Sequence, residues 1–201
     1  MVELRPATAD EMILAFLQAD IETLDPDRRK WFADALTARA ANRVTLIHRG
    51  DVHDPQQNSD RRFVLGVRGY GTKQALFTGF PSDTSWRLVK VTPDEVKDFR
   101  YANHLPNWAA VSGGTRLVGD AMRNLGKEQN AQISGNVAGI ASRVRKGEQF
   151  PALIAAQLTG ADEQVLIEGH NRATAYALIG LPNQIEMFIG SSSQMGGWLF
   201  F

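Results

Sequence analysis

The feature that most constrains this chain is the stretch from Gln164 to Thr174, which reads QVLIEGHNRAT. An apolar run at 165–167 ends at Glu168 and Gly169, and a helical spacing of apolar residues begins soon afterwards. This layout predicts a strand, a tight glycine turn and the start of a helix. The first N–H groups of a helix have no intrahelical acceptor and carry the positive end of its dipole. The corner is therefore predicted to bind an anion, most often phosphate.

Four residues of this corner are candidates for chemistry beside the glycine. Arg172 could contact phosphate through two N–H groups of its guanidinium, or it could only pair with Glu168. His170 titrates near neutral pH and is a candidate proton donor or base, or a residue that caps the helix. Glu168 could bind Mg²⁺ or deprotonate a substrate hydroxyl, or only balance the charge of Arg172. Asn171 is equally suited to be an N-cap or a ligand contact.

A second glycine turn, Ser112 to Arg116, is another candidate anion site. Consecutive N–H groups in such a turn can form a concave nest for an anion. The hydroxyls of Ser112 and Thr115 and the guanidinium of Arg116 could complete a nucleotide pocket beside Arg172. The alternative is a turn with a purely structural role, because the stretch lacks the lysine and the spacing of a phosphate-binding Walker loop.

Composition excludes several classes of protein. The chain has no cysteine, which excludes disulfides, thiolate metal sites and cysteine nucleophiles. Its 22 basic residues equal its 22 acidic residues, which argues against duplex DNA as a partner. The N-terminus lacks the pattern of a signal peptide, and the apolar runs are too short to span a membrane. We expect a cytoplasmic protein that makes no membrane contact.

The apolar periodicity predicts an α+β fold. Helices are expected at 8–19, 26–41, 136–146 and 171–179. Strands are expected at 43–48, 63–67, 74–80, 86–91, 151–157, 165–167 and 185–189. The early helices form a pair, the segments between 43 and 80 form a β-hairpin region around a turn at 69–71, and residues 53–60 are a polar loop. The apolar end GGWLFF is expected to pack on the fold or to form a subunit contact.

The last third of the chain resembles the ParB/sulfiredoxin superfamily. The pattern of that family is a helix that ends in glycine, a proline with an apolar strand, a strand that runs into a G-x-x-R turn, an alanine-bearing helix, a glycine and a closing strand. The matching residues here are Lys146-Gly147, Phe150 to Ile154, Val165 to Arg172, Ala173, Ala175, Gly180 and Ile185 to Ile189.

The resemblance implies a mixed sheet with packed helices over residues 101–201, acting as a nucleotide-binding module. Residues 1–100 would form a helical and β-hairpin extension, either separate or integral to the fold. Gly169 would make the turn and Arg172 would hold nucleotide phosphate. Sulfiredoxins carry a nucleophilic cysteine after the glycine, where this chain has His170, so their reaction is excluded. Partition-type ParB proteins continue into a DNA-binding helical domain, whereas this sequence ends at Phe201.

The resemblance thus implies an Mg²⁺-dependent phosphotransferase or nucleoside triphosphate hydrolase that uses ATP or CTP, with a small-molecule acceptor if phosphate is transferred. His170 or Glu168 would move protons or bind the metal, and we expect no dedicated protein metal site. The expected nucleotide-binding residues are Gly169, Asn171, Arg172, Ser112, Thr115 and Arg116. The alternatives are a nucleotide-sensing or protein-interaction module without turnover, and a ParB-like nuclease. A homodimer is compatible with each of these functions.

Overall fold

The chain forms one six-stranded mixed sheet in the order β1-β2-β6-β4-β5-β3, as seen in a computed structural model that describes residues 1–21 and 25–201. The strands are β1 (Val2–Ala7), β2 (Ser85–Val91), β3 (Arg100–Tyr101), β4 (Leu153–Leu158), β5 (Gln164–Glu168) and β6 (Ile185–Ser192). The pairs β4–β6 and β3–β5 are parallel, and the other three pairs are antiparallel. The α+β prediction is confirmed.

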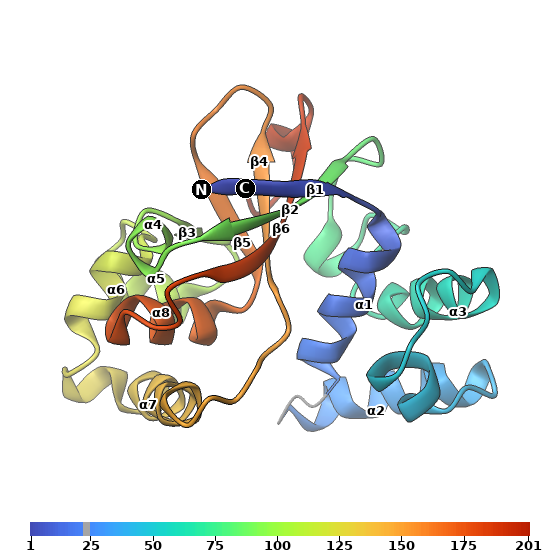
Figure 1. Ribbon diagram of the computed structural model, residues 1–201, viewed down its shortest axis with the longest axis horizontal. Coiled ribbons are helices and arrows are strands. Elements are labelled where there is room, and N and C mark those ends of the chain that lie inside the picture. The colour runs from blue at the N-terminus through green and yellow to red at the C-terminus, as the bar shows by residue number, and fades with distance from the viewer. Residues whose placement is uncertain (22–24) are drawn as a thin grey trace.

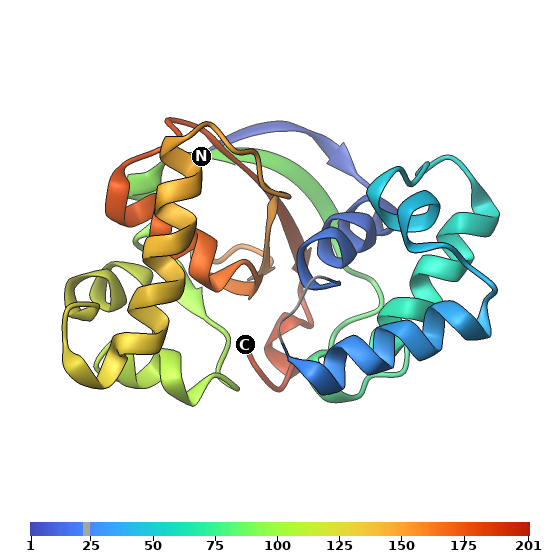
Figure 2. The ribbon, with the colours of Figure 1, turned by 90° about the horizontal axis from the view of Figure 1, so that it is seen from below.

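The helices form two groups on opposite sides of the sheet (Figures 1 and 2). The first group contains α1 (Ala9–Asp20), α2 (Pro26–Ala38), the π-helical turn η1 (Val44–His48) and α3 (Pro55–Gly66). The second group contains α4 (Pro93–Val96), α5 (Pro106–Val111), α6 (Val118–Asn124), α7 (Ala131–Arg145) and α8 (His170–Ile179). Short 3₁₀ turns are η2 (Ala75–Phe77), η3 (Glu128–Asn130) and η4 (Met195–Gly197). Among the described residues, no helix combines the length and apolar character needed to cross a membrane.

Each face of the sheet is covered by its own hydrophobic core. Successive side chains of a strand point to opposite faces. In β4, Ile154 and Ala156 belong to the core beneath α1 and α3, whereas Leu153 and Ala155 belong to the core beneath α8. This explains why the central strands read as continuous apolar runs in the sequence.

The N-terminal helices begin where capping residues predict. Thr8 accepts a hydrogen bond from the N–H of Glu11, and the Glu11 carboxylate accepts from the N–H of Thr8, a reciprocal capping box. Asp25 caps α2, in which Pro26 occupies the first turn. The predicted helical pair is confirmed, although α2 ends three residues earlier than expected.

The predicted β-hairpin region between residues 43 and 80 is wrong. The structure has η1, α3 and η2 there instead. Asp54 accepts hydrogen bonds from the N–H groups of Gln56 and Gln57, and Pro55 follows it, so a helix begins inside the expected polar loop. Val64 and Leu65 then face the core from α3. A short apolar run does not distinguish a strand from a buried helical face, which is why the pattern misled.

The last third has the predicted element order α7, β4, β5, α8 and β6. Strand β6 also hydrogen-bonds to β2, which pairs with β1, so the sheet includes strands from both sides of residue 100. The C-terminal end packs on the fold: the Trp198 indole N–H donates to the carbonyl of Leu76 at 2.8 Å. These connections tie the first helix group to the second.

Candidate functional site

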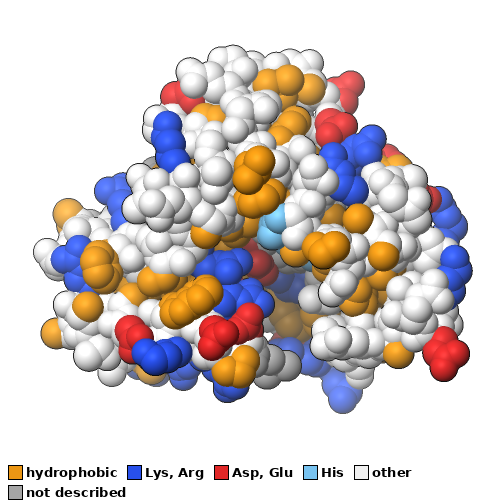
Figure 3. All heavy atoms as spheres, turned by 180° about the vertical axis from the view of Figure 1, so that it is seen from behind, with side chains coloured by type: hydrophobic (Ala, Val, Ile, Leu, Met, Phe, Trp, Pro, Cys, Tyr) orange, Lys and Arg blue, Asp and Glu red, His pale blue; other side chains and the backbone are white. Residues whose placement is uncertain are grey.

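A cavity of about 550 Å³ lies between the two helix groups and includes the corner predicted from the sequence. The first helix group and η2 contribute Gln18, Ala19, Asp20, Arg28, Arg68 and Leu76. The opposite side contributes His104, Leu105, Trp108, Ile140, Arg143, residues 148–151 and residues 167–172. Figure 3 shows a hollow on this face with basic, acidic and histidine side chains around it. Its volume is in the range of small-molecule sites.

The strand, glycine turn and helix start form as predicted. Gly169 has a φ of 100°, in the left-handed region that favours glycine, between β5 and α8. The first hydrogen bond of the helix runs from the N–H of Ala173 to the carbonyl of Gly169 at 2.8 Å, and no side chain caps the helix. Within the described residues, the N–H groups of residues 170–172 therefore have no protein acceptor. They line the cavity and are available to an anion.

Arg172 lines the cavity, but its guanidinium points toward the protein backbone. Nη1 donates to the carbonyls of Pro151 and Ala152. Nη2 lies 3.4 Å from Oε1 of Glu168, and the side chain is only 6% exposed. Arg172 thus joins the 151–152 backbone to the corner and pairs with Glu168, which is the second of the two roles inferred from the sequence.

His170 is held as a neutral imidazole. Its Nε2 lies 3.2 Å from the carbonyl of Leu166 and donates to it, which leaves Nδ1 as the acceptor. Burial lowers the pKa of His170 to about 4, despite the opposing effect of this hydrogen bond, and the charges of Arg172 and Arg68 lower it further. At neutral pH the ring can accept a hydrogen bond or a proton, and it carries no charge.

A buried chain of hydroxyls supports the start of α8. Thr174 donates to the carbonyl of His170 at 2.7 Å, and the Tyr101 hydroxyl donates to Thr174 at 2.7 Å. Burial raises the pKa of Tyr101, so its hydroxyl stays protonated. These bonds fix the first turn of α8 against β3.

Asp20, which ends α1, places a second carboxylate near Glu168. The residue is 5% exposed, and its Oδ1 lies 3.0 Å from Nη1 of Arg28 while Oδ2 lies 3.2 Å from Nε of Arg68. Burial raises the pKa of Asp20 to about 6, and the negative charge of Glu168 adds to this, whereas the two arginines oppose it. Two carboxylates that repel each other favour a bound proton or cation between them.

Buried polar atoms without a hydrogen-bond partner concentrate at this cavity. In the described part of the chain there are six such side-chain atoms, and four belong to residues of the cavity wall. Two of the four, Asp20 Oδ2 and Arg68 Nε, face each other at 3.2 Å as an ion pair. The other two, His104 Nδ1 and Asn171 Oδ1, have no partner within the described residues. Buried polar groups in folded proteins are nearly always satisfied by protein or by ordered water. His104 Nδ1 and Asn171 Oδ1 are therefore positions where ordered water or a polar group of a ligand would be accommodated.

The second predicted anion site lies outside the cavity. Ser112 Oγ accepts from the N–H of Arg116 at 2.9 Å, and Thr115 Oγ1 donates to Asp120 at 2.5 Å. The Arg116 guanidinium donates to the carbonyl of Tyr101 at 3.2 Å. These groups hold the turn to its surroundings, which is the structural role set out from the sequence, and they are not brought together with the corner at 168–172.

Six charged or ionisable residues of the cavity were not predicted from the sequence: Asp20, Arg28, Arg68, His104, Arg143 and Glu148. Three of them come from the first helix group, far along the chain from the glycine corner, and no local motif connects them. His104 lies between Tyr101 and Trp108, in a stretch that contains no binding motif. No group of three or more histidine, aspartate or glutamate side chains within residues 1–21 and 25–201 is arranged to hold a metal ion.

Comparisons of the chain with protein-family models, curated proteins and solved structures find no match. The functional inference therefore depends on the sequence pattern and on the geometry of the cavity.

Proposed function

We propose that the cavity binds a nucleoside triphosphate, ATP or CTP, with Mg²⁺, and that the protein transfers or hydrolyses the terminal phosphate. The observation that carries the proposal is an uncapped helix N-terminus in the wall of a cavity that also contains two buried polar atoms without protein partners among the described residues, His104 Nδ1 and Asn171 Oδ1. The element order of the last third supports a ParB/sulfiredoxin-like module. Phosphoryl transfer depends mainly on positioning and charge neutralisation, which these residues can supply.

The phosphates would be held from both walls. The N–H groups of residues 170–172 offer donors at the positive end of α8. Arg68, whose Nε is paired with Asp20 Oδ2 at 3.2 Å, would offer the remaining N–H groups of its guanidinium from the first helix group. Arg172 keeps this corner and the 151–152 backbone in place and adds positive charge.

Glu168, with the Asp20 carboxylate in its neighbourhood, would hold a divalent cation in this proposal. Mg²⁺ in nucleotide sites is typically held by one or two carboxylates together with phosphate oxygens. When bound, it neutralises phosphate charge. Glu168, at the end of β5 beside the phosphate-binding corner, is the residue that we assign to the metal.

Asp20 is the better candidate to take a proton from the attacking hydroxyl or water. A general base is most effective when its pKa lies near the working pH. The pKa of Asp20 is raised to about 6, whereas that of His170 is lowered to about 4. His170 is accordingly assigned to orient the reacting group through Nδ1. The candidate bases from the sequence were His170 and Glu168, and in this proposal Asp20 takes that role instead.

The test measures nucleotide binding by calorimetry and phosphate release with ATP, CTP, GTP and UTP in the presence of Mg²⁺. Arg68→Met should weaken binding by about tenfold or more, since a hydrogen bond to a charged group contributes about 1.5–3 kcal/mol. Asp20→Asn should retain binding and lose turnover. Arg123→Met, on α6 and outside the cavity, is the matched control and should change neither.

Each outcome of this experiment has a defined meaning. If none of the four nucleotides binds, the proposal is rejected. Binding without phosphate release would reject the enzyme and favour the nucleotide-sensing module.

A further inference from the structure

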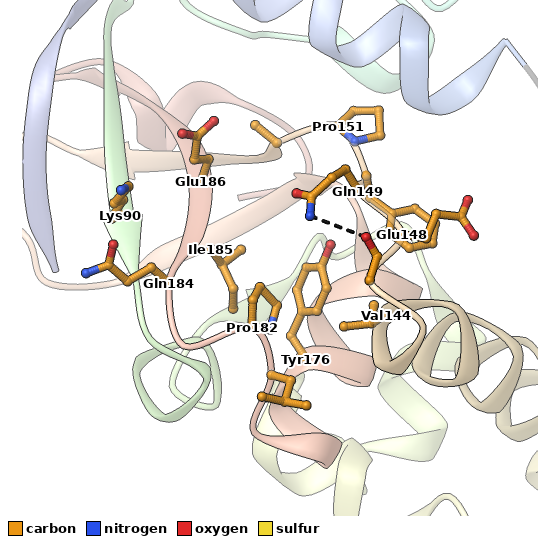
Figure 4. A pocket seen from close by; sticks show the side chains of 14 residues that line it. Lys90, Val144, Glu148, Gln149, Pro151, Tyr176, Pro182, Gln184, Ile185 and Glu186 are labelled. Atoms are coloured by element: carbon orange, nitrogen blue, oxygen red, sulfur yellow. Dashed lines mark hydrogen bonds between the residues drawn. The ribbon is translucent and has the colours of Figure 1, made fainter.

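A second cavity, of about 460 Å³, lies beside the first and shares the segment 148–151 as a wall (Figure 4). It is bounded by the end of α7, by α8, by the start of β6 and by Lys90 of β2. No part of the proposed phosphate chemistry uses it.

Tyr176 presents a hydroxyl to this second cavity. It follows Arg172 by four residues on α8, so consecutive turns of one helix serve the two cavities. Tyr176 is 5% exposed, and Figure 4 shows its hydroxyl pointing toward Gln149. Within the described residues this hydroxyl has no hydrogen-bond partner. Burial raises the pKa of Tyr176, so the group stays protonated and can both donate and accept.

The charges around the second cavity balance. Lys90 and Glu186 are directly opposite each other on β2 and β6, yet in the described part of the chain no ion pair within 4 Å joins them. Glu148, a further acidic group of the wall, is paired with Arg143. Because Glu148 is neutralised by Arg143, the wall has no excess charge of either sign that would favour an ionic ligand.

Neutral hydrogen-bonding groups and apolar surfaces complete the lining. The amides of Gln149 and Gln184 lie at its sides (Figure 4). Among residues 1–21 and 25–201, the one hydrogen bond of the Gln149 side chain is long, 3.5 Å, from Nε2 to the carbonyl of Gly147. Phe150, Pro182 and Ile185 add flat apolar surface. A purely apolar ligand would leave the hydroxyl and amides without partners, which is costly.

We propose that the second cavity binds a neutral, hydroxyl-rich small molecule of the sugar or polyol class. Each hydroxyl of such a ligand both donates and accepts, which matches the mixture of Tyr176, amide and charged groups. Its C–H surface matches the apolar residues of the wall. The inference does not depend on nucleotide binding at the first cavity.

The test uses calorimetry and saturation-transfer NMR with D-ribose, D-glucose, myo-inositol and glycerol as probes. Succinate, spermidine and a blocked tripeptide serve as anionic, cationic and peptide comparators. At least one polyol should bind saturably, and Tyr176→Phe and Gln184→Ala should each weaken it by up to about tenfold, the loss expected for one hydrogen bond. Leu178→Ala, on an exposed position of α8 outside the cavity, is the control and should not change binding.

Failure here is distinguishable from failure of the nucleotide proposal. Arg68→Met, in the wall of the first cavity only, should leave polyol binding intact. The proposal is overturned if no polyol binds, if Tyr176→Phe and Gln184→Ala bind like the unaltered protein, or if the tripeptide or a charged comparator binds more tightly than every polyol.

Discussion

At the scale of a single residue, Asp20 lies in the proposed site at a cost in folding stability. Its carboxylate is buried near a second carboxylate, and the two arginines beside it do not fully offset the loss of water, since its pKa is raised. Groups with strongly shifted pKa values cluster at functional sites for this reason. Exchange of Asp20 should therefore separate the two properties.

We predict that Asp20→Asn raises the free energy of unfolding at pH 7 by on the order of 2 kcal/mol while it abolishes turnover. The amide has nearly the same shape but has no charge to desolvate. Urea denaturation at pH 7 measures the effect. Asp34→Asn, at an exposed position on α2, is the control and should change stability little. A destabilised Asp20→Asn protein would contradict the prediction.

The pH dependence of stability is predicted from three groups together. Near pH 5, His104 and His170, with pKa values lowered to about 4, are neutral when folded and protonated when unfolded. Asp20, with its pKa raised to about 6, is protonated when folded and ionised when unfolded. The unfolded state thus binds two additional protons on the histidines and one fewer on Asp20. The net difference of about one proton makes stability rise by about 1.4 kcal/mol per pH unit.

This slope should be present between about pH 4, where the two histidines titrate in the folded state, and about pH 6. Well above pH 6.5 these three groups should make no further contribution to the pH dependence of stability. Urea denaturation across this range gives the slope. In His104→Gln the contributions of the two remaining groups nearly cancel, so the slope should fall by about 1.4 kcal/mol per pH unit relative to the unaltered protein. An unchanged slope in that variant would show that His104 is not held neutral.

The site residues divide into those that the sequence reveals and those that it does not. Residues 168–172 are adjacent in the chain, and local rules for turns and helix starts locate them. Asp20 and Arg68 reach the cavity only because α1 and the residues after α3 cover one face of the sheet. Their own neighbourhoods resemble ordinary amphipathic helices, and a packing relation across the sheet has no local pattern.

At the scale of an element, the β5–α8 corner depends on its glycine. A Cβ at Gly169 would lie 2.4 Å from Leu153 Cδ2, and φ is 100°. We predict that Gly169→Ala destabilises the fold by about 1–3 kcal/mol, since the backbone angle and the contact are both unfavourable. Gly139→Ala is the matched control, because α7 has open space there and alanine favours a helix by about 0.5–1 kcal/mol. Thermal unfolding of both variants should give shifts of opposite sign.

Elements were predictable where local signals agreed with one another. Strand β2 was found because apolar residues recur through WRLVKV, although the structure buries positions 86, 89 and 91 and half-buries the others. Helix α1 was found because its sequence begins with capping residues. In α3 the Asp54-Pro55 start was outweighed by the apolar run that follows, and the helix was taken for a loop and a strand. An apolar run indicates that a segment is buried, whereas a capping residue indicates that the segment is a helix.

At the scale of the whole molecule, the cavity is built from both sides of the sheet, so a bound nucleotide should link the two helix groups. We predict that saturating nucleotide with Mg²⁺ slows amide hydrogen exchange in the last turn of α1 and around His104 together. The end of β1, outside the cavity, is the internal control. Protection confined to the β5–α8 corner would mean that the first helix group does not contact the ligand.

The left-handed bend at Gly169 affects how a survey of variants should be interpreted. Nearly every substitution at Gly169 is expected to disrupt folding, whether or not the protein binds a ligand. Loss of function in these variants therefore reflects the backbone conformation and not a contact with the ligand. Cellular abundance and catalytic output measured side by side resolve the difference. Gly169 variants should lose both abundance and output, whereas Asp20→Asn should keep normal abundance and lose output. Other positions that behave like Asp20 in this comparison are candidates for a direct role in the chemistry.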